Sequence, residues 1–176
     1  SGAYKWLCGP FGAAFMYIAP RLSEKLDPGL VGFRSHKNMW DLDAKRFDYP
    51  HTAQKFEFST MAFGCAIGLT KAINFLNKVG VKKIFQYNRQ LADILVTGLR
   101  SRDAVVTLPL VDKNRSSIVT AYFKNIDSKE IITGLKAAQV FVSSRASAMR
   151  FSPHLYNTVE DIDTALAEID NSIMKM

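Results

Sequence analysis

The chain has 176 residues, of which 48% are hydrophobic and 22% charged, and its formal net charge is +7. This composition is ordinary for a globular protein of one domain, or of a small domain with part of another, and it excludes low-complexity and repeat architectures. The lysines and arginines are scattered, with Lys82-Lys83 as the densest group, so we read the positive charge as a solvated surface and expect no nucleic-acid partner.

The chain begins at Ser1 and carries an almost uncharged run from Trp6 to Pro20. This run is shorter than the roughly 20 apolar residues that cross a bilayer, so we expect no membrane span. Within it, residues 12–19 read GAAFMYIA, a short apolar stretch that predicts a buried strand. Because Lys5 lies so close to the first residue, the environment it needs must come from elsewhere, and we expect a piece of a longer protein.

Cys8 and Cys65 stand alone, without C-x-x-C spacing or a nearby histidine cluster. This usage fits reduced thiols in a cytoplasmic protein better than a disulfide framework. Since free cysteine is among the most buried residue types, we expect both thiols to be buried and inert.

Residues 21–58 have neither a helical nor a strand period, apart from a short turn at SEKL. A loop of that length within a compact domain is uncommon unless it serves a site or a partner surface. Helical spacing returns after Ser59 and Thr60, either of which can cap the helix, and Gly80 ends it. Its expected buried face comprises Met61, Cys65, Leu69, Ala72, Ile73 and Leu76.

A second helix is predicted over residues 81–100, and strands and helices then alternate. The strands are expected at residues 104–108, 117–123, 140–143 and 148–151. The sequences DSKE and TVED read as capping boxes that start helices at Asp127 and Thr158. The buried stripes of the second and last helices are Ile84, Asn88, Leu91, Leu95 and Leu99, and Val159, Ile162, Leu166, Ile169 and Ile173. This region predicts an α+β unit that can fold by itself.

Lys5 lies four residues ahead of a Gly-Pro-x-Gly turn in the stretch YKWLCGPFG. A lysine becomes a catalyst where its surroundings favour the neutral amine, because only that form attacks a carbonyl to make a Schiff base. The alternative is an exposed lysine before a turn, which is the commoner place for lysine.

The stretch YKWLCGPFGAAFMY resembles the lysine segment of the class V aminotransferase family, whose form is approximately H-K-W-x-x-G-P-x-G-x-G-x-x-Y. Tyr4 replaces the usual histidine and Ala14 the last glycine. The matching residues are Lys5, Trp6, Gly9, Pro10, Gly12 and Tyr17. The resemblance implies that Lys5 holds pyridoxal 5'-phosphate as an internal aldimine.

Two further stretches match this family in the same order. FEFSTMAFG is similar to its F-E-x-G-T segment, where the residue matching Thr60 reaches the cofactor phosphate of a neighbouring subunit; the alternative for Thr60 is a helix cap. MRFSPHLYNTVEDID resembles the R-x-S-x-H-x-Y-N-T-x-E-D-I-D close of the family, which implies that Arg150 holds the substrate carboxylate; the alternative is a surface ion pair.

The resemblance implies an α/β chain that is the C-terminal part of a fold-type I pyridoxal-phosphate transferase. Residues 1–79 would be the end of the cofactor-binding large domain, and residues 80–176 a small α+β domain with a mostly antiparallel sheet. The complete enzyme would act on an amino acid, as an aminotransferase or an isopenicillin N epimerase-like protein, and would be a homodimer. Most of its cofactor ligands would lie upstream, so we expect this chain alone to be inactive.

The absence of a cysteine before Arg150 limits the types of reaction that we expect. Desulfurases of this family need a cysteine in the loop before the carboxylate arginine, and residues 141–149 read FVSSRASAM. We therefore expect transamination, epimerisation or elimination, and not cysteine desulfuration. The competing class is a protein-interaction module that folds and binds its partner without a cofactor and in which Lys5 is dispensable.

Overall fold

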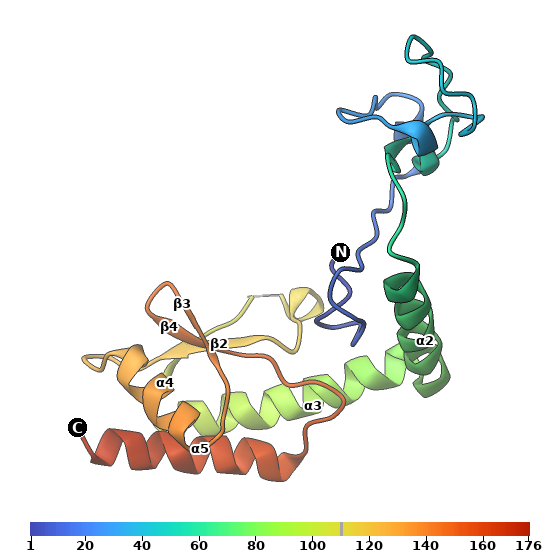
Figure 1. Cartoon of the computed structure of the whole chain (residues 1–176). Coiled ribbons are helices and arrows are strands. Elements are labelled where there is room, and N and C mark those ends of the chain that lie inside the picture. The colour runs from blue at the N-terminus through green and yellow to red at the C-terminus, as the bar shows by residue number, and fades with distance from the viewer. Residues whose placement is uncertain (110) are drawn as a thin grey trace. The chain divides into compact units, whose positions relative to one another are not determined.

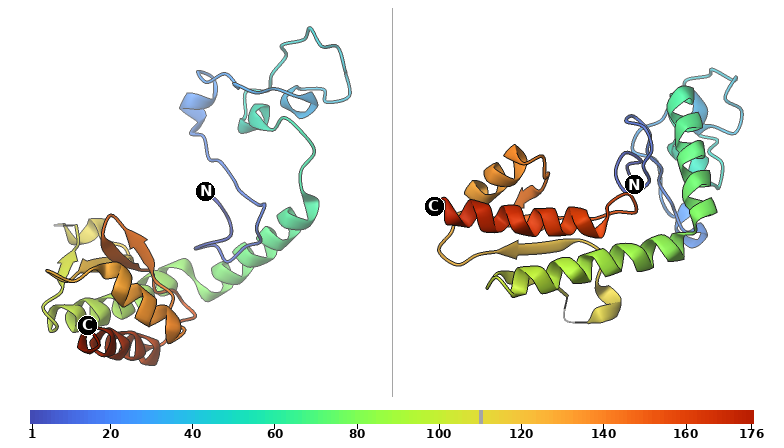
Figure 2. Two further views of the ribbon diagram at one scale, coloured as in Figure 1. Left: turned by 60° about the vertical axis from the view of Figure 1, so that its left-hand side comes forward. Right: turned by 90° about the horizontal axis from the view of Figure 1, so that it is seen from below.

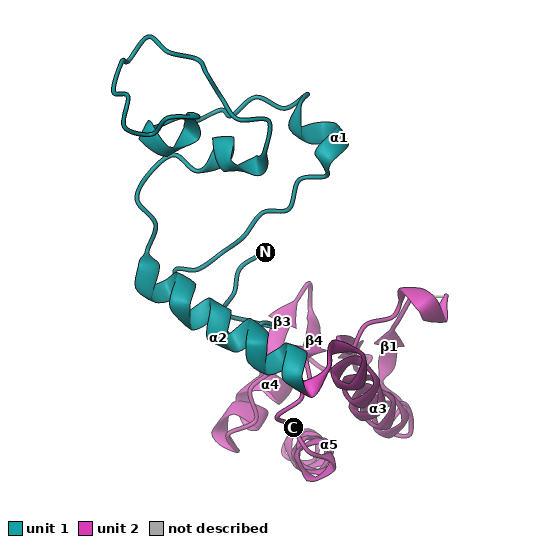
Figure 3. Cartoon of the chain, turned by 90° about the vertical axis from the view of Figure 1, so that its right-hand side faces the viewer, with its two compact units in different colours: residues 1–78 teal, residues 79–176 magenta. Residues whose placement is uncertain are grey.

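The computed structural model describes residues 1–109 and 111–176, in the element order shown in Figure 1. The chain divides into two compact units, residues 1–78 and residues 79–176 (Figure 3). The combination of helices with an antiparallel sheet confirms the predicted fold class. Each unit is described by itself.

The second unit is built on a four-stranded antiparallel sheet of order β1-β2-β4-β3. Its strands are β1 (Val105–Thr107), β2 (Val119–Tyr122), β3 (Ser143–Arg145) and β4 (Ala148–Phe151). The helices α3 (Val81–Arg100) and α4 (Ser128–Ala137) pack against it, and α5 (Val159–Met174) packs on these two helices (Figures 1 and 2).

Alternation along the two central strands gives the sheet one buried and one open face. In β2, Val119 and Ala121 are fully buried while Tyr122 is exposed. In β4, Met149 is fully buried and Arg150, the next residue, is only partly buried. Because successive side chains of a strand point to opposite faces, the helices cover the face that carries Met149 and leave the face of Arg150 free of helices.

The amphipathic stripes explain how α3 and α5 pack. The predicted stripe of α3 is buried at every position, which confirms it. Gly98 lets α5 approach closely, because a Cβ placed there would lie 2.3 Å from Leu166 Cδ1. At the start of α5 the predicted capping box is present: Thr158 N donates to Asp161 Oδ2 over 3.0 Å, which lowers the pKa of that carboxyl. At α4 only Asp127 acts as a cap, by accepting from Lys129 N.

The third predicted strand is displaced along the chain. It was expected at residues 140–143 and is found at Ser143–Arg145, because Ala146 and Ser147, both at positive φ, form a two-residue turn. That turn pairs Arg145 with Ala148 and so sets the register of the whole hairpin. Val140 instead packs against the core from outside the sheet.

The first unit contains α1 (Pro20–Ser23), two short 3-10 turns, η1 (Phe33–Ser35) and η2 (Ala53–Phe56), and α2 (Phe63–Val79). The expected buried strand at residues 12–19 is wrong: the described part of this segment forms only an isolated bridge between Gly2 and Ala14. Its Phe15, Met16 and Tyr17 are exposed, because no neighbouring strand in the unit pairs with or covers them.

Two other expectations for this unit are wrong. Along α2 only Leu76 of the predicted buried face is fully covered, because few segments of the unit pack on this helix. Cys8 is exposed and Cys65 is partly buried, although both were expected inside. Cys8 occupies a turn at φ 52, which places its side chain at the surface of the unit.

Candidate active site

Lys5 lies at the tip of a small loop formed by the first 15 residues of the chain. The loop is closed by backbone hydrogen bonds from Ala3 N to Ala13 O and from Gly9 N to Ala3 O, of 3.0 and 2.9 Å. Cys8 N donates to Lys5 O over 2.9 Å and completes the turn. The loop therefore fixes the backbone of Lys5 and leaves its side chain exposed.

Two glycines allow this loop to close and to lie against α2. A Cβ on Gly9 would be 3.0 Å from the Ala3 Cβ, and Gly12 has a φ of 86° that favours glycine. Pro10 packs near Gly68 of α2, where a Cβ would meet the proline ring at 3.1 Å. The geometry of the loop that carries Lys5 therefore requires the two glycines of the Gly-Pro-x-Gly sequence.

The lysine amine lies close to an aromatic pair. Its Nζ is 5.4 Å from the centre of the Tyr4 ring, and Tyr4 stacks on Phe11 with 4.9 Å between the ring centres. Tyr4 is the residue that stands where the family usually has histidine. The contact is a cation–π interaction, and it holds the amine at the surface of the loop.

Thr60 lies in the segment that joins η2 to α2. The helix begins at Phe63, and its first turn is closed by a bond from Ala66 N to Ala62 O of 3.0 Å. Neither Ser59 nor Thr60 therefore caps α2, so that expectation is wrong. The Thr60 side chain is exposed and makes no hydrogen bond within the described parts of the chain, so its hydroxyl can donate to an acidic group.

Arg150 lies at the centre of the open face of the sheet, with Thr120 and Ser143 as its partners on the two neighbouring strands. Its Nη2 donates to Ser143 Oγ over 3.2 Å, and its Nε is buried and has no hydrogen-bond partner within residues 1–109 and 111–176. No carboxylate in these ranges pairs with it, so the surface ion pair is wrong here. A planar guanidinium with an unused donor can bind a carboxylate or phosphate through two bonds.

Lys5 and Thr60 belong to the first unit, and Arg150 belongs to the second. Lys5 presents its amine and Thr60 its hydroxyl from the first unit. Arg150 presents a guanidinium with an unpartnered Nε from strand β4 of the second unit. Among the described residues no three His, Cys, Asp or Glu side chains are grouped so as to hold a metal ion. None of the described helices is long and apolar enough to cross a membrane.

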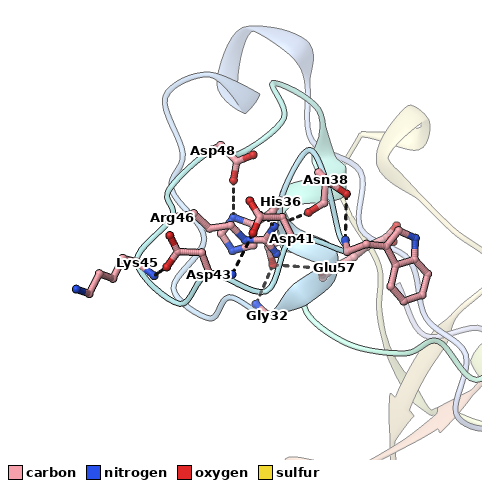
Figure 4. Close-up of polar contacts among 11 residues, drawn as sticks. Gly32, His36, Asn38, Asp41, Asp43, Lys45, Arg46, Asp48 and Glu57 are labelled. Carbon is pink, nitrogen blue, oxygen red and sulfur yellow. Dashed lines mark hydrogen bonds and ion pairs between the residues drawn. The ribbon is translucent and has the colours of Figure 1, made fainter.

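Sequence reasoning missed a network of polar contacts in residues 21–58 (Figure 4). His36 is buried and its Nδ1 lies 3.0 Å from Asp48 Oδ1, while Asn38 and Asp41 side chains accept from nearby backbone N–H groups. Glu57 joins the network through its backbone carbonyl. No periodic pattern could have revealed these contacts, because they join side chains to the backbone or, for His36 and Asp48, to each other within an irregular segment. The aspartates of this segment were the only signal.

The chain belongs to the aminotransferase class-V family, whose pattern matches residues 1–165. It is similar to a probable cysteine desulfurase of Borreliella burgdorferi, with 24% identity over 97% of this chain and 44% of that protein. It is also similar to the uncharacterized aminotransferase YcbU of Bacillus subtilis, with 25% identity over 96% of this chain and 44% of that protein. The chain therefore spans less than half the length of these relatives.

Solved structures share the fold. The apo cysteine desulfurase of Thermococcus onnurineus has a TM-score of 0.86 at 20% identity, over 99% of this chain and 46% of that one. A C-DES mutant with glycine covalently linked to its PLP cofactor has a TM-score of 0.81 at 20% identity, over 96% of this chain and 44% of that one. These likenesses identify the chain as part of the fold that these enzymes adopt.

Proposed function

We propose that this chain is the C-terminal part of a pyridoxal-phosphate enzyme that acts on an amino acid. Residues 1–79 would complete its cofactor-binding large domain, and residues 80–176 would form its small domain. The observation that carries this proposal is the guanidinium of Arg150, which has a buried Nε without a partner on the open face of the sheet. Arg34, Arg89 and Arg115 also leave a buried Nε without a partner, but each of them pairs with a carboxylate. Arg150 pairs with no carboxylate within residues 1–109 and 111–176, so its charge is available to a ligand.

The residues present fit the cofactor. Lys5 offers an exposed amine that can form a C=N bond with the cofactor aldehyde, with loss of water. Thr60 offers a free hydroxyl to the cofactor phosphate of the neighbouring subunit in a homodimer. Relatives of the same fold include one whose cofactor is PLP. The bound cofactor would stabilise negative charge at the substrate Cα, which no side chain of this chain can do.

The remaining steps fall to this chain's own side chains. Arg150 binds the α-carboxylate through its fork and so fixes which bond at Cα is presented for reaction. The Lys5 amine would carry a proton to or from Cα. The Tyr4 ring lies beside the Lys5 amine and stacks on Phe11, so the cation–π contact orients the amine.

The choice of reaction is also a proposal. Relatives named as probable cysteine desulfurases support sulfur chemistry, and YcbU is named as an aminotransferase. In this chain the residues before Arg150 contain no cysteine, so the thiolate that would receive sulfur is missing from that loop. We therefore favour transamination, epimerisation or elimination. The unpaired thiols Cys8 and Cys65 suit the reducing cytoplasm, where we place the enzyme.

The alternative, a cofactor-free interaction module, makes a different prediction for Lys5. Borohydride reduction of the complete enzyme with PLP, followed by peptide mapping, should place the adduct on Lys5, and Lys5→Ala should remove it. This chain by itself should trap little cofactor, because it supplies only part of the ligand set. If the complete enzyme folds and carries no adduct on Lys5, the interaction module is favoured instead.

The role of Arg150 has its own test. Arg150→Lys keeps the charge and loses the fork, so amino-acid binding by the complete enzyme should weaken by about tenfold or more, since charged contacts in dry sites are worth about 2 to 5 kcal/mol. The matched control is Arg145→Lys, in the exposed part of the same hairpin. The cofactor absorbance should be unchanged in both. Equal amino-acid binding by the two variants would remove Arg150 from the site.

A further inference from the structure

The segment that leads to Thr60 is held by the turn η1. Ser35 Oγ donates to Glu57 O over 3.1 Å and accepts from Gly32 N over 3.2 Å. This one buried hydroxyl therefore links residues 32–35 to Glu57 (Figure 4). Beside it, Arg34 Nη2 lies 2.8 Å from Glu57 Oε2. We call these contacts between residues 32–35 and residues 57–58 the 32–58 clamp.

The backbones also touch within this clamp. A Cβ on Gly32 would lie 1.9 Å from Phe58 O and 2.9 Å from Phe58 C, which no side chain can occupy. Glycine is required here by close approach and not by its dihedral angles, since its φ of −158° is extended. Residues 57 and 58 are therefore fixed by hydrogen bonds on one side and by backbone packing on the other.

Thr60 follows the clamp closely along the chain. The clamp holds the chain up to Phe58, and α2 begins at Phe63. Upstream, the buried Nζ of Lys55 donates to Ser23 O over 2.5 Å, so η2 is anchored as well. Because Thr60 lies only two residues beyond Phe58, the clamp limits how far the Thr60 hydroxyl can move from residues 32–35.

We propose that the 32–58 clamp positions Thr60 for the phosphate of the cofactor, with Ser35 and the Arg34–Glu57 pair as positioning residues. This inference rests on the proposed function and deepens it. None of the clamp residues needs to touch the cofactor. A hydroxyl that is held in place before binding loses less conformational entropy when it donates to the phosphate, so the clamp raises affinity for the phosphate group in particular.

The first test uses the chain as it stands. Ser35→Ala removes both clamp bonds of the hydroxyl, and chymotrypsin should then cut after Phe58 about fivefold faster, because cleavage follows the population of the open segment. The matched control is Ser128→Ala, since Ser128 is equally buried and its Oγ donates to Ser147 O over 2.9 Å in the other unit. An unchanged cutting rate at Phe58 would overturn the clamp.

The second test uses the complete enzyme and compares its affinity for PLP with that for pyridoxal, which lacks the phosphate. Thr60→Ala and Ser35→Ala should each lower the PLP preference, by about three- to tenfold, and the double variant should lower it no further, because both act on one interaction. Ser128→Ala should leave the preference unchanged. General destabilisation would instead weaken both ligands alike. Glu57→Gln, which breaks the ion pair with Arg34, gives the same readout if Ser35→Ala does not fold.

The outcomes separate the two proposals. A loss of PLP preference in Thr60→Ala with none in Ser35→Ala and Glu57→Gln would overturn the clamp and leave the role of Thr60 standing. No loss in Thr60→Ala would overturn the clamp and the role of Thr60 together. The adduct on Lys5 is measured separately, so its absence reports failure of the proposed function and not of the clamp.

Discussion

The unused donor of Arg150 predicts that this residue contributes little to stability. Arg150→Met removes the guanidinium and keeps a long side chain. It loses one long hydrogen bond, from Nη2 to Ser143 Oγ at 3.2 Å, worth about 0.5–1 kcal/mol. It also relieves a buried Nε without a partner, which costs about 1 kcal/mol for a partly buried group. The two effects offset each other, so the free energy of unfolding should change by less than about 1 kcal/mol.

Arg102→Met in the same unit is the matched comparison. Arg102 donates from Nε and Nη2 to the two carboxylate oxygens of Asp170, over 2.7 and 2.8 Å, and from Nη1 to Gly98 O over 2.9 Å. Because Asp170 is more than a third exposed, solvent reduces the value of this pair, and we expect a loss of about 1–2 kcal/mol.

Urea unfolding of the chain, followed by circular dichroism at 222 nm, measures both variants, since this signal includes the helices of the second unit. The expected order of stability is wild type and Arg150→Met together, with Arg102→Met below them. If Arg150→Met lowers the free energy of unfolding as much as Arg102→Met does, then the guanidinium of Arg150 is a structural group and its assignment to a ligand is refuted.

Three further predictions concern other parts of the molecule. Hydrogen bonds from Arg102 lower the pKa of the Asp170 carboxyl below its usual 3.8, so the stability from this pair is present above that pH and is lost as the pH falls through the lowered value; Asp170→Asn should flatten this acid limb in unfolding measured from pH 6 to pH 2. Gly98→Ala should lower the midpoint of thermal unfolding, because the new Cβ would overlap Leu166 Cδ1 at 2.3 Å and overpacking costs about 1–3 kcal/mol; an unchanged midpoint would mean that α5 shifts freely. The complete protein incubated with cysteine should carry no persulfide, and a persulfide that is lost on replacing Cys8 or Cys65 would contradict the proposed reaction class.

The sequence predicted best those elements whose own pattern decides their structure. The stripe of α3, from Ile84 to Leu99, is buried throughout, and β4 has the expected bounds, with Met149 and Phe151 buried on either side of Arg150. The proposal that Arg150 binds a ligand came from family resemblance and not from periodicity. The structure adds that Nε of its guanidinium is a hydrogen-bond donor without a partner among the described residues.

The errors arise where structure depends on neighbours that no local pattern encodes. Residues 12–19 have the composition of a buried strand, but a strand needs a partner, and the described first unit supplies one bridge. β3 lies further along the chain than expected because the turn at Ala146 and Ser147 fixes the register, and neither residue is typical of a turn in which both residues have positive φ. The 32–58 clamp joins Ser35 to Glu57, 22 residues further along the chain, and no spacing rule detects such a contact.

The exposed side chains of residues 15–17 affect how this chain behaves at high concentration. Phe15, Met16 and Tyr17 follow one another in an extended, uncharged stretch, the kind of segment that pairs with an identical copy through its backbone. Self-association measured on the separate chain would then report strand pairing in this stretch and would say nothing about the oligomeric state of the complete protein. Replacing Phe15 and Tyr17 with lysine would distinguish the two, because like charges oppose strand pairing and leave other contacts between subunits in place.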